Sequence, residues 1–151
     1  MNMKKQVIGI KNSKNPAGIF SNFPLGKRII LDTNFLLIPI QFKVDIFSEI
    51  DRICLFKYKL YIVDKTIDEL KKIIEKQKGK HKFAAKIALQ LIKKKNVGVI
   101  KTKEGHVDDL ILDVLDKDTF LATQDAILRK KAVKKGAKVI VLRAKKYLVL
   151  K

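Results

Sequence analysis

Short apolar runs alternate with stretches of helical apolar spacing from residue 28 to the end of this chain. The runs are strand-like in length and composition, and they comprise Ile29–Leu31, Leu60–Val63, Val97–Ile100, Phe120–Ala122 and Val139–Leu142. Helical spacing occupies the segments around residues 34–39, 43–56, 66–77, 81–95, 107–116 and 126–135. Strands and helices that alternate in this way pack as a parallel sheet with helices on both faces, so we expect an α/β fold.

Residues 1–27 have a different composition from the rest. They are polar and contain several Asn, Pro and Gly residues, which predicts an extended basic arm with at most a short strand at Val7–Ile10. The remaining residues, 28–151, are enough for one domain with a buried core. Gly136 lies between the last predicted helix and the last predicted strand, where it fits a helix C-terminal cap.

The charge of the chain indicates its class of partner. There are 34 Lys and Arg residues and 15 Asp and Glu residues, which gives a net charge of +19. A field of this sign attracts polyanions, so nucleic acid is the expected partner. A lysine-rich surface of the thermophilic kind is the alternative, but the acidic residues are too few to pair with so many cations.

Several classes of protein are excluded by what the chain lacks. No apolar run approaches the roughly 20 residues that cross a bilayer, so we expect a cytoplasmic protein without membrane contact. A single cysteine, Cys54, and two histidines exclude a zinc finger, and Cys54 is expected to be a buried small side chain. No glycine-rich phosphate loop and no histidine–serine pairing for a nucleophilic triad are present.

Four carboxylates occupy comparable positions after the predicted strands. Asp32 and Asp125 follow strands directly, whereas Glu69 and Asp108 lie at the start of the helices after two others. Each has a structural alternative: Asp32 and Asp125 could cap helices, Thr66 and Glu69 match a capping box, and Asp108 could favour a helix N-terminus.

The positions of the four acids nevertheless converge. The carboxyl ends of parallel strands meet at one edge of a sheet, which is where α/β proteins bind ligands. Carboxylates gathered there would repel one another unless they were protonated or bridged by cations. Hard ions such as Mg²⁺ or Mn²⁺ favour oxygen ligands of this type, so we expect a metal-binding catalytic set at this edge.

Helical phase separates neighbouring acids. At about 100° per residue, Asp108 lies at the border of a buried stripe, whereas Asp109 points away from it. Asp109 is kept as a supporting candidate because the helix start could be displaced by one residue. Asn34 and Thr123 are polar neighbours that could orient an acid or a water molecule, although a turn residue and a strand-end hydroxyl are the alternatives.

Basic residues cluster beside these acids. A phosphate-bearing strand could lie across two groups, and the candidate residues for binding nucleic acid are Lys71, Lys72, Lys76, Lys78, Lys80, Lys82, Arg129 and Lys130. The alternative is that such runs are only the solvated faces of amphipathic helices.

Four short motifs occur in order along the chain: Leu31-Asp32-Thr33-Asn34, Asp68-Glu69-Leu70, Asp108-Asp109-Leu110-Ile111 and Ala122-Thr123-Gln124-Asp125. Together they resemble the acidic motifs of PIN-domain nucleases, over about residues 28–143. The longer run from Leu31 to Phe42, with Val44–Phe47 after it, resembles the archaeal relatives of the PIN nuclease that processes small-subunit ribosomal RNA. VapC-type toxins resemble it more distantly, because they usually begin almost directly with the first strand.

The resemblance implies a three-layer α/β/α PIN-like domain with a parallel five-stranded sheet. It further implies a Mg²⁺- or Mn²⁺-dependent endoribonuclease, with Asp32, Glu69, Asp108 and Asp125 as the acidic set and Thr123 as a polar helper. The expected substrate is RNA, in particular pre-ribosomal RNA. Ribosome-assembly factors and a second copy of the chain are partners that the resemblance leaves open.

Two other functions stay open at this point. A VapC-type toxin would share the site but would require a cognate antitoxin. A catalytically silent RNA-binding subunit of a ribosome-assembly complex would belong to a different class of protein. Such silent relatives tend to lose acids of the set, and none is lost here.

Overall fold

The computed structural model describes residues 7–9, for which only the backbone is considered, and residues 26–151. The predicted N-terminal arm therefore lies outside the described residues, except for residues 7–9 and 26–27. Within the described residues, no helix is long and apolar enough to cross a membrane.

Among the described residues, seven strands form a single sheet in the order β1-β4-β3-β2-β5-β6-β7. The strands are β1 (Val7–Gly9), β2 (Lys27–Leu31), β3 (Tyr58–Val63), β4 (Gly98–Lys101), β5 (Thr119–Ala122), β6 (Lys138–Arg143) and β7 (Tyr147–Leu150). The five predicted strands correspond to β2–β6, and all of them pair in parallel. β1 adds a parallel strand at one edge and β7 an antiparallel strand at the other.

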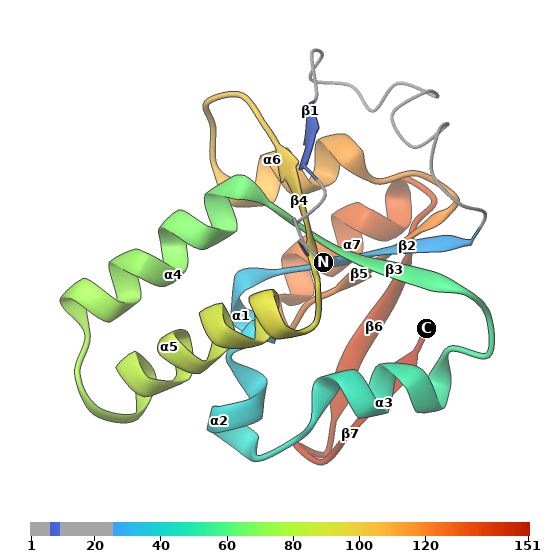
Figure 1. Cartoon of the computed structure of the whole chain (residues 1–151). Coiled ribbons are helices and arrows are strands. Elements are labelled where there is room, and N and C mark those ends of the chain that lie inside the picture. Colours follow the sequence, from blue (N-terminus) through green and yellow to red (C-terminus); the bar gives the residue numbers. More distant parts are fainter. Residues whose placement is uncertain (1–6, 10–25) are drawn as a thin grey trace, which may run out of the picture.

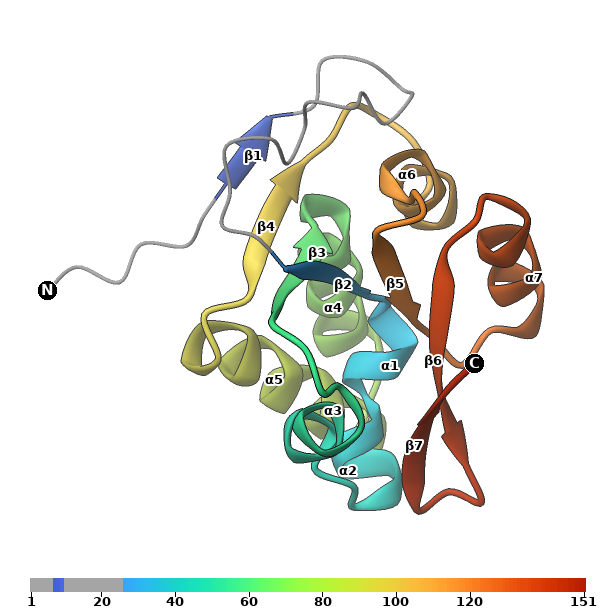
Figure 2. The ribbon, with the colours of Figure 1, turned by 90° about the vertical axis from the view of Figure 1, so that its right-hand side faces the viewer.

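Helices cover both faces of this sheet (Figures 1 and 2). The helices are α1 (Thr33–Leu36), α2 (Ile38–Phe42), α3 (Ile46–Ile53), α4 (Asp64–Lys76), α5 (Gly79–Lys94), α6 (Val107–Val114) and α7 (Ala126–Lys134). Helices α1–α5 contribute to one apolar cluster and helices α6 and α7 to a second one. The expected three-layer α/β/α architecture is confirmed.

The central strand β2 shows why the core has two halves. Successive side chains of a strand point to opposite faces, and Ile29 and Leu31 belong to the α1–α5 cluster while Ile30 belongs to the α6–α7 cluster. All three side chains are fully buried. A strand that is buried on both faces has a continuous apolar sequence, and this pattern is why Ile29–Leu31 could be predicted as a strand.

Two local predictions differ from the structure. The helix expected at 34–39 is divided into α1 and α2 at Leu37, because Pro39 has no N–H and its ring would clash within a continuous helix. The capping box at Thr66 is wrong, since α4 already begins at Asp64. Glu69 therefore does not cap this helix.

The β6–β7 hairpin was not predicted, and side chains of α3 cover part of its outer edge. The Leu148 N–H donates to Glu49 Oε1 (2.9 Å), and Arg52 Nη2 donates to the Leu148 carbonyl oxygen (3.1 Å). Arg52 also donates to both carboxylate oxygens of Glu49. An exposed sheet edge invites pairing with other chains, so this pair of side chains protects the edge at Leu148.

We predict that Glu49→Ala lowers the melting temperature by a few degrees and promotes self-association, because the Leu148 N–H loses its acceptor. The hydrogen bond from Arg52, followed by that from Leu148, lowers the pKa of Glu49 below its ordinary value. A lowered carboxyl pKa stabilises the fold above the ordinary pKa, and this contribution disappears as the pH falls through the folded-state pKa. Thermal unfolding and light scattering should therefore separate Glu49→Ala from wild type at pH 7 but not at strongly acid pH. Glu75→Ala, an exposed glutamate on α4, is the control.

Candidate active site

A pocket of about 530 Å³ brings together residues from several distant segments of the chain. It lies where β2 and β5 end, at the carboxyl edge of the parallel sheet. All four predicted acids line it. The full lining is Asp32, Thr33, Asn34, Leu37, Gln41, Glu69, Lys72, Ile73, His81, Asp108, Gln124 and Asp125.

Asp32 is the buried acid of this pocket, with only 4% of its surface exposed. Its Oδ1 accepts a hydrogen bond from the Thr33 N–H (2.8 Å), and its Oδ2 accepts one from the Thr123 hydroxyl (2.7 Å). Burial raises the pKa of Asp32 to about 6, against the opposing effect of these hydrogen bonds. The charges on Asp108 and Glu69 act in the same direction as burial.

Thr123 connects Asp32 to the second acid that follows a strand. The Thr123 hydroxyl, fully buried, accepts a hydrogen bond from the Asp125 N–H (3.0 Å) while it donates to Asp32. Asp125 Oδ1 accepts from the N–H groups of Ile127 (2.8 Å) and Leu128 (3.1 Å), so Asp125 is the N-cap of α7. The predicted capping role is real, and it leaves Asp125 Oδ2 without a hydrogen bond from any described residue.

Glu69 and Asp108 come from helices on opposite faces of the sheet. The Thr33 hydroxyl donates to Glu69 Oε1 (2.5 Å), which fixes the α4 acid beside the residue that follows Asp32. Burial, then Asp125 and Asp109, raise the pKa of Asp108, while Lys131 lowers it. Asp108 lines the pocket, and Asp109 is not among the lining residues.

Asn34 and Gln124 join the two loops that carry Asp32 and Asp125. The Gln124 N–H donates to Asn34 Oδ1 (3.3 Å), and Gln124 Nε2 donates to the Asn34 carbonyl oxygen (3.0 Å). Sequence reasoning singled out Asn34 but missed Gln124, although it lies within the fourth acidic motif. Gln41 and His81 also line the pocket and were not among the predicted site residues.

The donor chemistry of the pocket suits a hard divalent cation. Its ionisable lining is dominated by carboxylates, and their mutual repulsion contributes to the raised pKa values of Asp32 and Asp108. Carboxylate oxygens are the ligands that Mg²⁺ and Mn²⁺ prefer. Within residues 7–9 and 26–151, however, no three His, Cys, Asp or Glu side chains form a ready-made metal site.

The predicted basic residues lie on α4, α5 and α7 and in the turn between α4 and α5. Six of the eight are exposed, and Lys82 and Arg129 are half-buried. Lys72 lines the pocket itself, and Lys80 Nζ donates to the Gln41 carbonyl oxygen (3.3 Å) at its rim. One predicted cation thus lines the pocket, and a second contacts a residue of its lining.

Comparison with known proteins identifies the family. The model of a family described as PIN like domain matches residues 29–145 of this chain. The chain belongs to the PIN-like domain family. The expected family and fold are thereby confirmed.

This PIN-like domain has a curated relative and similar solved structures. It is 31% identical to Ribonuclease VapC4 of Methanocaldococcus jannaschii over 124 residues, which is 80% of this chain and 93% of that protein. The structure of the PIN domain endonuclease Utp24 matches with a TM-score of 0.69 and 23% identity, covering 82% of this chain and 90% of that one. A domain of a functionally unknown M. jannaschii protein matches with a TM-score of 0.55 and 18% identity, covering 78% and 92%.

We predict that Asp32→Asn stabilises the metal-free PIN-like domain at pH 7 by about 1–3 kcal/mol. The gain is expected because the pKa of Asp32 in the folded state, about 6, lies above the ordinary value of 3.8. A raised carboxyl pKa means that the folded state binds more protons, so the wild type loses stability as the pH rises from about 4 to 6. Asparagine removes this charge while it can still bond to Thr33 and Thr123. Denaturant unfolding in EDTA should show the gain at pH 7 and none at pH 4. Destabilisation at pH 7 would contradict the assignment of Asp32 as a strained acid.

Proposed function

We propose that this chain is a metal-dependent endoribonuclease that hydrolyses RNA phosphodiester bonds with a metal-activated water. The observation that carries the proposal is the convergence of Asp32, Glu69, Asp108 and Asp125 on one pocket in a chain of net charge +19. An acidic hollow in such a chain suits cations, whereas the surrounding surface suits a polyanion. The ribonuclease name of the VapC4 relative and the endonuclease title of the Utp24 structure support the same activity.

In this proposal Asp32 and Asp125 are direct ligands of Mg²⁺ or Mn²⁺, and Glu69 and Asp108 complete the site directly or through water. The bound ion would lower the pKa of a water molecule and neutralise charge on the scissile phosphate. Thr123 keeps the two ligands in position, since its hydroxyl bonds to Asp32 and to the Asp125 backbone. Asn34 is a supporting residue that connects the two ligand loops through Gln124. No side chain is required as the nucleophile.

Phosphate binding falls to the basic residues around the acids. Lys72 lines the pocket. The other candidates are Lys71 and Lys76 on α4, Lys78 between α4 and α5, Lys80 and Lys82 on α5, and Arg129 and Lys130 on α7. These side chains would hold the RNA backbone on both sides of the scissile bond, because positive charge supplies most of the affinity for a nucleic acid backbone.

The biological role that we propose is pre-ribosomal RNA processing in small-subunit biogenesis, in the cytoplasm, with ribosome-assembly factors as candidate partners. The run from Leu31 to Phe47 supports it. The second candidate is a VapC-type toxin, which the 31% identity to Ribonuclease VapC4 favours. Growth arrest on expression, relieved by a neighbouring small antitoxin, would select the toxin. Specific cleavage of a precursor ribosomal RNA would select processing.

We predict that the purified protein cleaves single-stranded RNA in Mn²⁺ and that Asp32→Asn lowers the rate at least about a hundredfold, since a lost ligand removes several kcal/mol of catalysis. RNA affinity should be retained, because the lysines supply it. Asp68→Asn, the exposed neighbour of Glu69, is the matched control and should cleave at the wild-type rate. Equal cleavage by Asp32→Asn and wild type would defeat the assignment.

The adjacent acids of α6 give a second test. We expect Asp108→Asn to lower the cleavage rate about 10–100-fold, as for residues that position a metal, because Asp108 lines the pocket. Asp109→Asn should have little effect, since it removes a charge outside the lining. The cleavage rate and, by calorimetric titration, the Mn²⁺ affinity are measured for both variants. The reverse order of effects would show that Asp109 is the third acid.

A further inference from the structure

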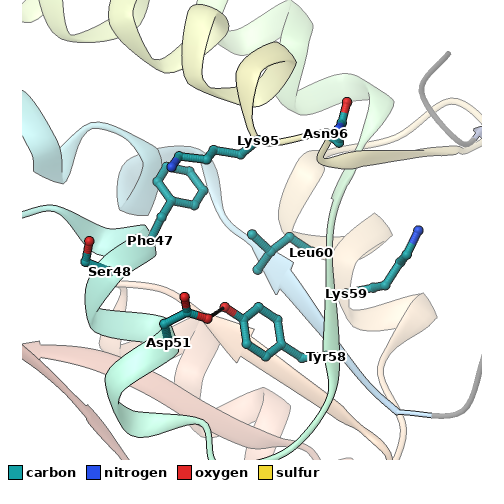
Figure 3. Close-up of a pocket in the computed structure, with 8 residues that line it drawn as sticks. All are labelled: Phe47, Ser48, Asp51, Tyr58, Lys59, Leu60, Lys95 and Asn96. Carbon is teal, nitrogen blue, oxygen red and sulfur yellow. Dashed lines mark hydrogen bonds between the residues drawn. The ribbon is translucent and has the colours of Figure 1, made fainter. Parts of the chain in front are cut away.

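Two more hollows lie beyond the active-site pocket, on the side of the molecule formed by α2, α3 and α5. The first has a volume of about 350 Å³ and is lined by Phe47, Ser48, Asp51, Tyr58, Lys59, Leu60, Lys95 and Asn96. Figure 3 shows it between α3, the start of β3 and the end of α5, with Lys95 extended over the Phe47 ring. The second, of about 420 Å³, shares Phe47 and Lys95 with the first and is also lined by Lys43 and Lys94. The two hollows therefore share part of their lining.

Helices α2 and α5 connect these hollows to the acidic pocket. The two helices pack against each other. On α2, Gln41 lines the acidic pocket, and Lys43, immediately after α2, lines the second hollow. On α5, His81 lies at the acidic pocket, and Lys95 follows the opposite end of the helix. At 1.5 Å per residue, these two positions are roughly 20 Å apart. A chain molecule could pass from one pocket to the next along this surface.

The lining of the two hollows carries positive charges that form no salt bridges with described carboxylates. Lys43, Lys59, Lys94 and Lys95 are all exposed, and none forms a salt bridge with a described carboxylate. We call these four residues the Lys95 track.

The two acids beside the Lys95 track already have partners. Asp45 accepts from the N–H groups of Phe47 and Ser48 (both 3.1 Å) as the N-cap of α3. Asp51 accepts a short hydrogen bond from the Tyr58 hydroxyl. Lys95 lowers the pKa of Asp45, though less than the hydrogen bonds from Ser48 do. The acids therefore only partly offset four exposed lysines.

We propose that the Lys95 track binds the phosphates of single-stranded RNA that flanks the cleaved bond, several nucleotides from the acidic pocket. This inference rests on the proposed RNA substrate. Lysines along a groove with aromatic and apolar side chains, here Phe47, Tyr58 and Leu60, are typical of surfaces that hold unpaired strands. A duplex has its bases paired and stacked inward, so it cannot offer them to hollows of this kind.

The test measures RNA binding without cleavage, in EDTA. Fluorescence anisotropy of the full chain with labelled oligouridines of about 16 and about 4 nucleotides gives affinity as a function of salt. Lys95→Ala should weaken binding of the long oligomer and make its log–log salt slope shallower by about 0.7, the value for one lost phosphate contact on a single strand. In the double variant Lys94→Ala/Lys95→Ala, the salt slope should be shallower by about twice that amount. Binding of the short oligomer should not change.

Lys138→Ala is the matched control. Lys138 Nζ lies 6.0 Å from the centre of the Phe120 ring, and Lys95 Nζ lies 5.5 Å from that of Phe47, so both variants lose one charge and one ring contact. An equal change of slope in Lys95→Ala and Lys138→Ala would overturn the proposal. A larger loss of affinity for duplex RNA than for single-stranded RNA in Lys95→Ala would also overturn it. The nuclease assignment is tested separately by Asp32→Asn. A shallower slope together with unchanged cleavage by Asp32→Asn would support the track while it refuted the catalytic site.

Discussion

The candidate site depends on one buried hydrogen bond, from the Thr123 hydroxyl to the Asp32 carboxylate. The backbone pairing of β2 with β5 places Leu31 beside Ala122, so the two residues that follow, Asp32 and Thr123, emerge next to each other. The same hydroxyl accepts from the Asp125 N–H. One threonine thus sets the distance between two acids that are far apart in the sequence. Without this pairing, Asp32 and Asp125 would be two unrelated helix caps.

Opposite electrostatic environments exist side by side in this molecule. The pocket gathers carboxylates whose burial and mutual repulsion raise the pKa of Asp32 and Asp108, while lysines dominate the surface around it. Such an arrangement destabilises the protein alone and favours a bound cation, which is the usual relation between stability and function at a strained site. Under the proposed function, a chain of net charge +19 would attract RNA while its acidic pocket would hold a divalent ion.

Much of the fold could be predicted because its strands are apolar on both faces. Ile29–Leu31 and Phe120–Ala122 read as continuous apolar runs, and the helices between them keep their apolar spacing. The β7 strand was missed because Tyr147–Leu150 is short and partly exposed, and its pairing comes from contact with β6 and α3. The Thr66 capping box failed for a related reason. Helix α4 follows β3 directly and begins at Asp64, so the local preference of Thr66 for an N-cap position did not set the start of the helix.

The sequence by itself determined the order of the five central strands, the sign of the net charge and the positions of the four candidate acids along the chain, because these depend on local patterns of side chains. The tertiary structure decided what the acids share. Sheet order placed Asp32 and Asp125 on adjacent strand ends, and the Thr33 hydroxyl brought Glu69 to them across 36 residues. Gln124, Gln41 and His81 joined the pocket only through packing between distant segments. Gln124 stands within the fourth acidic motif, but the contacts of all three residues in the pocket are long-range, and such contacts are fixed by burial of the whole core and not by neighbours along the chain.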